Sequence, residues 1–344
     1  MKSKNRKIGT ATIFSMNKLQ KIDRKKLEER VKQAYSLLSP CRLCPRNCKV
    51  DRLKNKKGFC KAGLLPQIAS FHAHYGEEPP ISGQKGSGTI FFSNCSLRCV
   101  FCQNYSLSQL GEGSEVSIEE LANIILKLQR LGCHNINFVT PTHYTAQILA
   151  ALVIAKEKGL EIPLVYNCGG YESVETLKIL DGTIDIYMPD FKYGDNASAK
   201  RYSGAADYVE IAKLAHKEMY RQVSDLVIEN GVAVRGLLIR HLVMPNGLAS
   251  SKKIFDFIAK EISPDTAVNI MAQYYPTHLA DEYPEINRIP TIQEYSEALQ
   301  MAKDAGLNYG WRQTVATLVR EKIPEWKDGK APESDFPTPG VGKI

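Results

Sequence analysis

Residues 89–104 read TIFFSNCSLRCVFCQN, a stretch in which three closely spaced cysteines follow an apolar run. The run Thr89–Phe92 is strand-like, and Cys95, Cys99 and Cys102 come next in a C-x3-C-x2-C pattern. A cubane iron–sulfur cluster has four irons and is conventionally held by four thiolates, so three thiolates leave one iron able to bind a small chelating molecule. Buried structural thiols are the plainer alternative. The close spacing favours the cluster.

From Thr89 onward, short apolar runs alternate with helical patterns, which is typical of parallel strands with helices outside them. The expected strands are Thr89–Ser93, Ile136–Thr140, Ile162–Tyr166, Ile184–Met188, Gly236–Val243 and Val268–Ala272. The expected helices are Ile118–Leu131, Thr145–Lys158, Val174–Leu180, Tyr208–Asn230, Ser251–Glu261 and Ile292–Asp304. Six strands are too few for a closed eight-stranded barrel. The sequence therefore predicts an α/β fold, a partial (β/α)6 TIM-like barrel with its chemistry at the carboxyl ends of the strands.

Composition divides the chain into five parts. We expect a basic, partly helical and solvated arm at 1–40, a four-cysteine segment at 41–75, a Gly/Pro-rich connection at 76–88, the barrel core at 89–320 and a mobile tail at 321–344. The arm contains one helical pattern, Arg24–Ser36. The connection reads GEEPPISGQKGSG, a composition that disfavours helices and central strands. The tail is rich in proline, glycine and charge, as mobile extensions are.

A second cysteine group precedes the barrel core. Cys41, Cys44, Cys48 and Cys60 are spaced C-x2-C-x3-C-x11-C, within CRLCPRNCKVDRLKNKKGFC. Four thiolates suit a closed site, either tetrahedral zinc or a second iron–sulfur cluster, and the spacing does not separate the two. Cations around the group would offset thiolate charge and could dock an acidic electron donor. They are Arg42, Arg46, Lys49, Arg52, Lys54, Lys56 and Lys57.

Composition also bears on location and partners. No apolar run is long enough to cross a bilayer, and Met1–Lys7 is not followed by an apolar segment, so we expect a cytoplasmic protein with no membrane partner. Thiols stay reduced in the cytoplasm, which favours metal or cofactor binding by clustered cysteines over disulfides. The net charge of +8 partly reflects the basic N-terminal stretch, and we do not expect nucleic acid as a partner.

Polar or unusual residues stand at every expected strand end. After the three-cysteine stretch they are 140–143 (TPTH), 167–172 (NCGGYE), 190–192 (DFK), 240–241 (RH) and 273–278 (QYYPTH). Each alone is compatible with a turn, a helix cap or an exposed ion pair. Because the carboxyl ends of parallel strands meet at one rim, their joint placement favours a functional site.

From about Ser82 to Arg312 the chain resembles the glycyl-radical-enzyme activating branch of the radical S-adenosylmethionine (SAM) superfamily, typified by pyruvate formate-lyase activating enzyme. The matching phrases are 86–104, 137–143 (NFVTPTH) and 188–195 (MPDFKYGD). The chain is still more similar to a less characterised sister group with an N-terminal C-x2-C-P-x2-C segment. The resemblance implies that a 4Fe–4S cluster, reduced by a flavodoxin- or ferredoxin-type donor, cleaves SAM to methionine and a 5′-deoxyadenosyl radical. That radical abstracts hydrogen from a substrate.

The same resemblance implies roles for individual residues. The implied cluster ligands are Cys95, Cys99 and Cys102, and the implied adenine contacts are Phe101 and Gln103. The implied contacts to the amino, ribose and carboxylate groups of SAM are Pro141, Thr142, Asp190, Lys192 and Arg240. Pro141 and Thr142 stand where the family has a Gly-Gly-Glu motif, so backbone carbonyls would hold the amino group here. A zwitterionic ligand needs such a mixture of cations and acceptors. A buried Asp–Arg structural network is the alternative for the last of these residues.

Two other functions remain open on the sequence alone. SAM could donate a methyl or aminocarboxypropyl group on the same scaffold, or both cysteine groups could hold structural zinc in a binding module. An open three-thiolate site and a polar rim count against the zinc module. The substrate, which could be a protein or a small molecule, is not identified by the sequence.

Overall fold

The computed structural model describes residues 17–313, and the expected mobile tail at 321–344 lies outside this range. Its strands are β1 (Gln67–His74), β2 (Ser87–Phe92), β3 (Ser114–Glu115), β4 (Ile136–Val139), β5 (Leu164–Cys168), β6 (Ile186–Pro189), β7 (Val227–Glu229), β8 (Val232–Leu242), β9 (Ala267–Met271) and β10 (Gly310–Arg312). Its helices are α1 (Arg24–Ser36), α2 (Pro79–Ser82), α3 (Tyr105–Ser108), α4 (Ile118–Arg130), α5 (Thr145–Glu157), α6 (Val174–Ile179), α7 (Asn196–Ser203), α8 (Tyr208–Val223), α9 (Ser251–Phe257) and α10 (Ile292–Asp304).

The six expected strands lie side by side in one sheet. The sheet order is β10-β9-β8-β6-β5-β4-β2-β1-β3, and every pair from β2 to β9 in this series is parallel. The predicted α/β fold with a mostly parallel sheet is thus confirmed, whereas the partial-barrel shape stays a prediction. All six carboxyl ends share one edge, which is where the strand-end residues gather.

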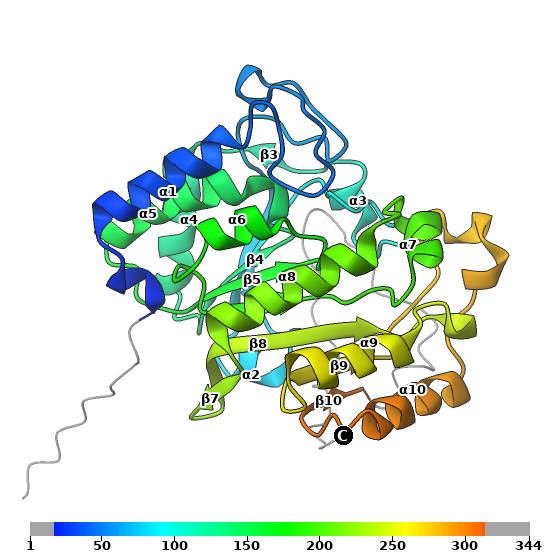
Figure 1. Ribbon diagram of the computed structural model, residues 1–344. Coiled ribbons are helices and arrows are strands. Elements are labelled where there is room, and N and C mark those ends of the chain that lie inside the picture. The colour runs from blue at the N-terminus through cyan, green and yellow to red at the C-terminus, as the bar shows by residue number, and fades with distance from the viewer. Residues whose placement is uncertain (1–16, 314–344) are drawn as a thin grey trace, which may run out of the picture.

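Local signals account for the helices that follow the strands. A capping box at Ser117 and Glu120 starts α4, and a second one at Thr291 and Glu294 starts α10. Both helices begin at the expected residue, and α10 also ends where expected, at Asp304. Figure 1 shows α8, α9 and α10 following one another along the outside of β8 and its neighbours.

The N-terminal helix is not solvated on all sides. α1 has the expected bounds, but it packs along α5 with Leu27 and Ala34 buried (Figure 1). The Lys156 ammonium of α5 also donates to the carbonyl of Leu19, at 3.1 Å. The expectation of a solvated arm is therefore wrong for residues 17–40, because a few apolar side chains in this basic stretch suffice to anchor it.

The region before β2 carries more structure than its composition predicts. β1 pairs antiparallel with β2, and the connection 76–88 contains α2, which starts on Pro79. A proline at the first position of a helix costs no intrahelical hydrogen bond, because the N–H group at that position has no partner within the helix. Pro79 is therefore compatible with the start of α2, whereas a proline in the middle of a helix would disrupt it. Residues 76–88 accordingly form ordered structure, in which Ile81 and its neighbours Pro80 and Ser82 are buried.

The expected helix Tyr208–Asn230 is too long. α8 ends at Val223, and β7 and β8 then form a hairpin through Asn230 and Gly231, both with positive φ (52° and 82°). Asn-Gly is the sequence preferred in tight hairpin turns, since both central residues need left-handed backbone. The described residues contain no helix that is long and apolar enough to cross a membrane.

Candidate active site at the carboxyl ends of the strands

The three-cysteine loop leaves the carboxyl end of β2 and is fixed by backbone contacts. Asn94 adopts left-handed backbone (φ 74°) and its N–H donates to the Leu107 carbonyl at 2.8 Å. Farther along, the Val100 N–H donates to the Tyr202 carbonyl at 2.9 Å. The loop is therefore held between the turn at α3 and the end of α7.

Each of the three sulfur atoms has a polar neighbour. The Ser203 hydroxyl donates to Cys99 at 2.9 Å, the Leu97 N–H donates to Cys95 at 3.3 Å, and Ser108 lies 3.1 Å from Cys102. Removal from water raises the pKa of Cys95 to about 12, and the neighbouring Cys99 adds to the rise. Burial likewise raises the pKa of Cys102.

These thiols fit an iron–sulfur cluster by type. Thiolates are its usual ligands, and hydrogen bonds to the sulfurs are one of the means by which a protein tunes it. Within residues 17–313, no three His, Cys, Asp or Glu side chains are gathered so that they could hold a single metal ion. The assignments of metal to both cysteine groups remain predictions.

Asp190 and Lys192 form an ion pair at the end of β6, close to the three-cysteine loop. The Lys192 ammonium lies 2.5 Å from Asp190 Oδ2, and the two side chains are 23% (Asp190) and 19% (Lys192) exposed, so a ligand can still reach them. Burial lowers the pKa of Lys192, but Asp190 and Cys99 outweigh it and the pKa is raised. The ammonium is thus charged and within electrostatic reach of the thiols.

A glycine lets β5 approach the same place. A Cβ atom added to Gly169 would lie 2.6 Å from a Leu97 methyl group and 3.7 Å from the Lys192 side chain. The first distance is shorter than real Cβ contacts, so a larger residue would require the Leu97 side chain to move. The absence of a side chain at residue 169 therefore leaves room for the Leu97 side chain of the loop beside the end of β5.

Phe101 and Gln103 link the loop to the segment after β9. Phe101 is buried, with its ring 5.5 Å from the ring of Tyr274, and the Gln103 amide donates to the Gln273 carbonyl at 2.7 Å. The two residues predicted to contact adenine thus connect the first and last of the six expected strands. Their contact with a ligand stays a prediction.

The segment after β4 is tied to a buried acid. The Thr142 hydroxyl donates to Glu172 Oε1 at 2.6 Å, and the Tyr166 hydroxyl donates to the other carboxyl oxygen at 3.2 Å. His143 does not face this acid: its Nε2 lies 2.8 Å from the Ser93 carbonyl, and burial lowers its pKa to about 3. Thr142 is therefore oriented by Glu172, while His143 is neutral and structural.

Glu172 should make stability depend on pH. Burial raises its pKa from 4.5 to about 7, although hydrogen bonds from Thr142 and Tyr166 oppose the rise. Between these values the folded state holds a proton that the unfolded state has released, so stability falls as pH rises, by on the order of 3 kcal/mol for one such carboxyl. We expect Glu172→Gln to gain stability relative to the wild type between pH 5 and pH 8, measured by urea unfolding. Burial also raises the pKa of Asp185, to about 6. Because Asp185 is present in both proteins, its effect on the pH dependence of stability cancels in the comparison. If the free energy of unfolding of the two proteins changed with pH in the same way, the expectation would be contradicted.

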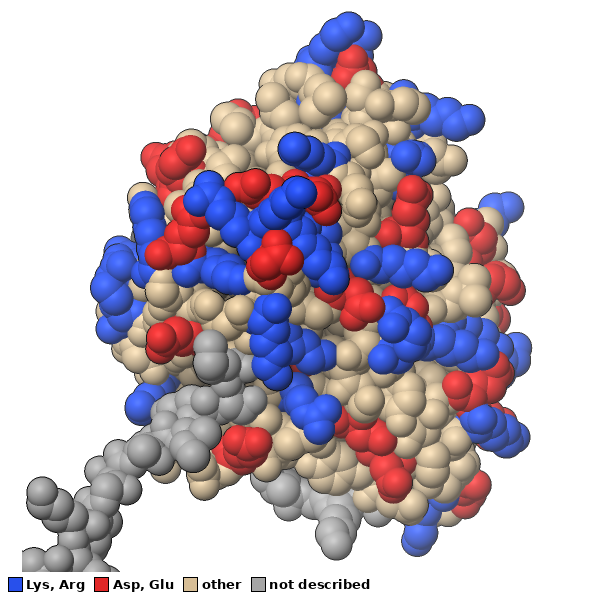
Figure 2. Space-filling view, turned by 60° about the vertical axis from the view of Figure 1, so that its left-hand side comes forward, with Lys and Arg blue, Asp and Glu red and all other residues tan. Residues whose placement is uncertain are grey.

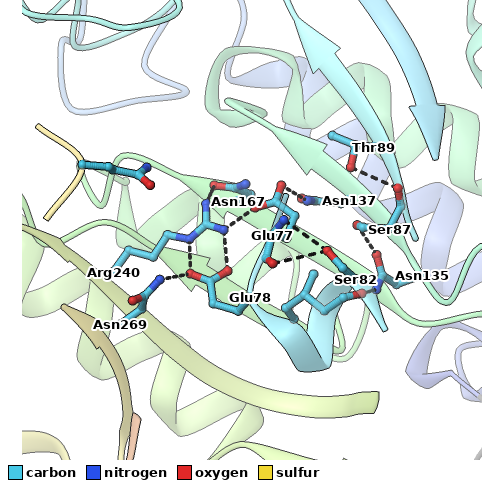
Figure 3. A network of polar contacts seen from close by, with 12 residues as sticks. Glu77, Glu78, Ser82, Ser87, Thr89, Asn135, Asn137, Asn167, Arg240 and Asn269 are labelled. Atoms are coloured by element: carbon cyan, nitrogen blue, oxygen red, sulfur yellow. Dashed lines mark hydrogen bonds and ion pairs between the residues drawn. The ribbon is translucent and has the colours of Figure 1, made fainter. Parts of the chain in front are cut away.

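The Arg240 guanidinium is hydrogen-bonded to two glutamates that the sequence did not indicate, Glu77 and Glu78 (Figure 3). Its Nε donates to Glu78 Oε1 at 2.7 Å and its Nη2 donates to both Glu77 and Glu78. Asn137 and Asn269 donate to the same carboxylates, at 2.8 and 2.6 Å. The signal that could have found the two acids is their position, adjacent to one another and directly before Pro-Pro. The side-chain partners of Arg240 are therefore glutamates, not the aspartate of the Asp–Arg alternative, since the Asp190 side chain pairs with Lys192.

The four-cysteine segment packs against the strand ends instead of standing apart. Cys41, Cys44 and Cys60 are buried, and the Leu43 carbonyl accepts a hydrogen bond from Thr176 at 2.6 Å. Figure 1 draws the segment at the top of the molecule, and Lys and Arg side chains stand there in Figure 2. Of the seven cations, five are exposed, Arg46 is half-buried and Arg52 is buried. The exposed five are available to an acidic partner.

Arg46 connects the two cysteine groups. It lies between Cys44 and Cys48, yet its guanidinium donates to the Ser96 carbonyl at 2.8 Å and the Ser203 carbonyl at 2.7 Å. The first carbonyl belongs to the three-cysteine loop, and Ser203 is the residue whose hydroxyl donates to Cys99. One side chain thus reaches from the four-cysteine segment to the three-cysteine loop and to the residue that donates to Cys99.

Replacing this arginine should loosen the loop. Hydrogen bonds to a charged group contribute about 1.5–3 kcal/mol each, so Arg46→Ala should destabilise the protein by at least about 2 kcal/mol. We also expect a lower iron content at the three-cysteine site, measured after anaerobic reconstitution. The matched control is Arg42→Ala in the same segment, since Arg42 is 46% exposed and pairs with Glu175 only at 3.5 Å. Exposed pairs contribute about 0–1 kcal/mol. Equal effects of the two substitutions would contradict the coupling role.

Comparison with known proteins identifies the class. Residues 89–236 match the family described as the radical SAM superfamily, a range that contains the three-cysteine loop and the Asp190–Lys192 pair. The chain belongs to this superfamily and is a radical SAM enzyme.

Two relatives come from Methanocaldococcus jannaschii. The chain is similar to "Uncharacterized protein MJ0674", at 35% identity over 305 residues that cover 86% of this chain and 83% of that protein. It is also similar to "Uncharacterized protein MJ0808", at 24% identity over 292 residues that cover 78% and 79%.

Proposed function

We propose that this enzyme cleaves SAM reductively at the three-cysteine loop and abstracts hydrogen from a protein or small-molecule substrate. A 4Fe–4S cluster held there would supply the electron that splits the sulfonium and leaves a 5′-deoxyadenosyl radical. The resemblance to activating enzymes makes a protein one candidate hydrogen donor. A flavodoxin- or ferredoxin-type protein in the cytoplasm is the proposed electron source, and the exposed lysines of the four-cysteine segment are suited to dock it.

One observation carries this proposal: the Asp190–Lys192 pair lies at the same strand-end edge as the three thiols and is still partly exposed. A charged ammonium offers a partner for the carboxylate of SAM, and a carboxylate offers an acceptor for ribose hydroxyls. In the unliganded protein the two groups neutralise each other. When SAM binds, its carboxylate and ribose hydroxyls can therefore replace the contact between Lys192 and Asp190 with contacts of similar polarity.

The other site residues have supporting roles. Glu172 orients Thr142, so that the Pro141–Thr142 turn keeps its carbonyls in place for the amino group of SAM. Phe101 and Gln103 join the loop to the segment after β9 and offer an aromatic edge and an amide to adenine. Arg240 is already satisfied by Glu77 and Glu78, so its share in holding the carboxylate is smaller than that of Lys192.

The deciding experiment is product analysis. Anaerobically reconstituted, dithionite-reduced protein should convert SAM to methionine and 5′-deoxyadenosine, and Asp190→Ala should weaken SAM binding about ten- to a hundredfold with iron content unchanged. S-Adenosylhomocysteine or methylthioadenosine as the product would instead indicate group transfer. Metal analysis of the same preparation should give about eight irons if the four-cysteine segment holds a cubane, and about four irons with zinc otherwise.

A further inference from the structure

We infer that Ser203 raises the reduction potential at the three-cysteine loop by donating a hydrogen bond to Cys99, and that Arg46 positions Ser203 for this role. Because Arg46 belongs to the four-cysteine segment, that segment influences electron uptake at the other cysteine group. The inference deepens the proposed function and rests on it in one respect: a reduction potential exists only if the loop holds the proposed iron–sulfur cluster.

The hydroxyl of Ser203 is directed at the Cys99 sulfur by a second hydroxyl. Ser203 Oγ lies 2.9 Å from Cys99 Sγ and 2.7 Å from the Tyr193 hydroxyl oxygen. A serine hydroxyl has one hydrogen, so while it donates to the sulfur, the Tyr193 hydroxyl must be the donor to Ser203. Ser203 is 3% exposed and Tyr193 is fully buried, so water does not compete for these contacts. Two hydrogen bonds in series therefore end on the sulfur.

A hydrogen bond to a ligand sulfur favours the reduced state of a cluster. Reduction adds one electron, and part of the extra negative charge resides on the sulfur ligands, so a donor at the sulfur stabilises the reduced state more than the oxidised one. Hydrogen bonds in a chain also polarise one another, which adds the Tyr193 hydroxyl to the effect. Loss of either hydroxyl should therefore lower the reduction potential.

Arg46 fixes the end of α7, the helix that carries Ser203. The last carbonyls of a helix have no partners within the helix. The Arg46 guanidinium supplies partners here, because it donates to the carbonyl of Ser203 at 2.7 Å and to that of Gly204. A cation at this end of a helix also interacts favourably with the helix dipole. Arg46 is thus a capping group for α7 that comes from a distant part of the chain.

The same guanidinium binds the three-cysteine loop. Its Nε donates to the Ser96 carbonyl at 2.8 Å, and its Nη2 donates to the Leu97 carbonyl at 3.4 Å. Both carbonyls lie between Cys95 and Cys99. Arg46 therefore holds the helix end that carries the hydroxyl donor and the loop that carries the sulfur acceptor, which keeps the two within hydrogen-bond distance.

The four-cysteine segment determines where the guanidinium lies. Arg46 stands between Cys44 and Cys48, and Phe59 directly precedes Cys60. The Phe59 ring centre lies 3.9 Å from the central carbon of the guanidinium, a stacking contact that restrains the guanidinium plane. The two stacked residues thus lie within two positions of three of the four cysteines. A structural change around these cysteines is transmitted through Arg46 to Ser203.

Redox titration of the anaerobically reconstituted protein tests the inference, with the paramagnetic resonance signal that is missing in Cys99→Ala as the readout. We expect Ser203→Ala to make reduction about tenfold less favourable, a potential about 59 mV lower for one electron. Tyr193→Phe keeps the buried ring and should cause a smaller shift of the same sign. Arg46→Lys keeps the positive charge but loses the planar fork, and should also lower the potential. Melting temperature and iron content establish that each variant is folded and loaded.

A double-mutant cycle shows whether Arg46 acts through Ser203. If it does, Arg46→Lys should shift the potential at most about half as much in a Ser203→Ala background as in the wild type. The matched control is Ser108→Ala, which removes a hydroxyl 3.1 Å from the Cys102 sulfur. Its shift should add to that of Arg46→Lys. Arg42→Ala, at an exposed arginine of the same segment, should leave the potential unchanged.

The outcomes distinguish failure of the inference from failure of the proposed function. An unchanged potential in Ser203→Ala, or a shift in Arg46→Lys that is equal with and without the Ser203 hydroxyl, would overturn the inference. If Ser203→Ala does not fold, an unchanged potential in Tyr193→Phe has the same meaning. Shifted potentials without any 5′-deoxyadenosine from the wild type would remove the proposed function and leave the inference standing. 5′-Deoxyadenosine formation with no shift in any variant would do the reverse.

Discussion

Cys99→Ala should reduce 5′-deoxyadenosine formation to the background of the reagents, while the fold is retained. The three-cysteine loop has no spare thiol, because the proposed cluster would need Cys95, Cys99 and Cys102 and would already lack a fourth protein ligand. Cys99 is also the most firmly placed of the three, since it is buried and accepts a hydrogen bond from Ser203 at 2.9 Å.

Two measurements check this expectation. Iron content and the absorbance of the cluster should fall with activity, and circular dichroism should stay unchanged. The matched control is Cys133→Ala, a buried cysteine outside both groups, which should keep its iron and its activity. Wild-type product formation by a folded Cys99→Ala protein would rule out the assignment of this loop.

Arg240→Ala should destabilise the fold more than the loss of any exposed cation. It removes the cation that serves two buried carboxylates, and breaking a buried ion pair from one side costs about 3–5 kcal/mol. Urea unfolding measures the loss. The control is Arg235→Ala, an exposed arginine on the same strand, which should cost less than about 1 kcal/mol.

A compensating variant identifies the cause. Adding Glu77→Gln and Glu78→Gln to Arg240→Ala removes the charges that were left unpaired, so part of the lost stability should return. A loss of less than about 1 kcal/mol in Arg240→Ala, together with weaker SAM binding, would instead mean that Arg240 serves the ligand and not the network.

Local rules made much of the fold predictable. Alternation of apolar runs with amphipathic stretches located all six parallel strands, although most of their ends shifted by one or two residues. The bounds of α1 and α10 agree with the prediction because their caps lie in the sequence itself, Asp23 for α1 and Thr291 for α10. The three-cysteine pattern indicated the superfamily for the same reason, since the residues of one loop lie close together in sequence and their spacing can be read directly.

Structure between the main elements was harder to predict. The β7–β8 hairpin has a recognisable Asn-Gly turn, but a continuous helical pattern in Tyr208–Val223 masked it. β1 carries polar residues on a half-buried strand, so it lacks the apolar run by which the central strands were recognised. Its position in the sheet comes from pairing with β2, a contact between segments that no local pattern records.

The sequence by itself determined the α/β class, the six parallel strands and the three-thiol loop, because these depend on residue spacing within one element or one turn. Only the tertiary structure decided what surrounds them. Glu77 and Glu78 meet Arg240 across more than 160 residues, and Arg46 reaches Ser96 and Ser203 across 50 and 157. Such partners are set by how strands and loops pack, and a buried charge takes whichever counter-charge the fold brings within reach.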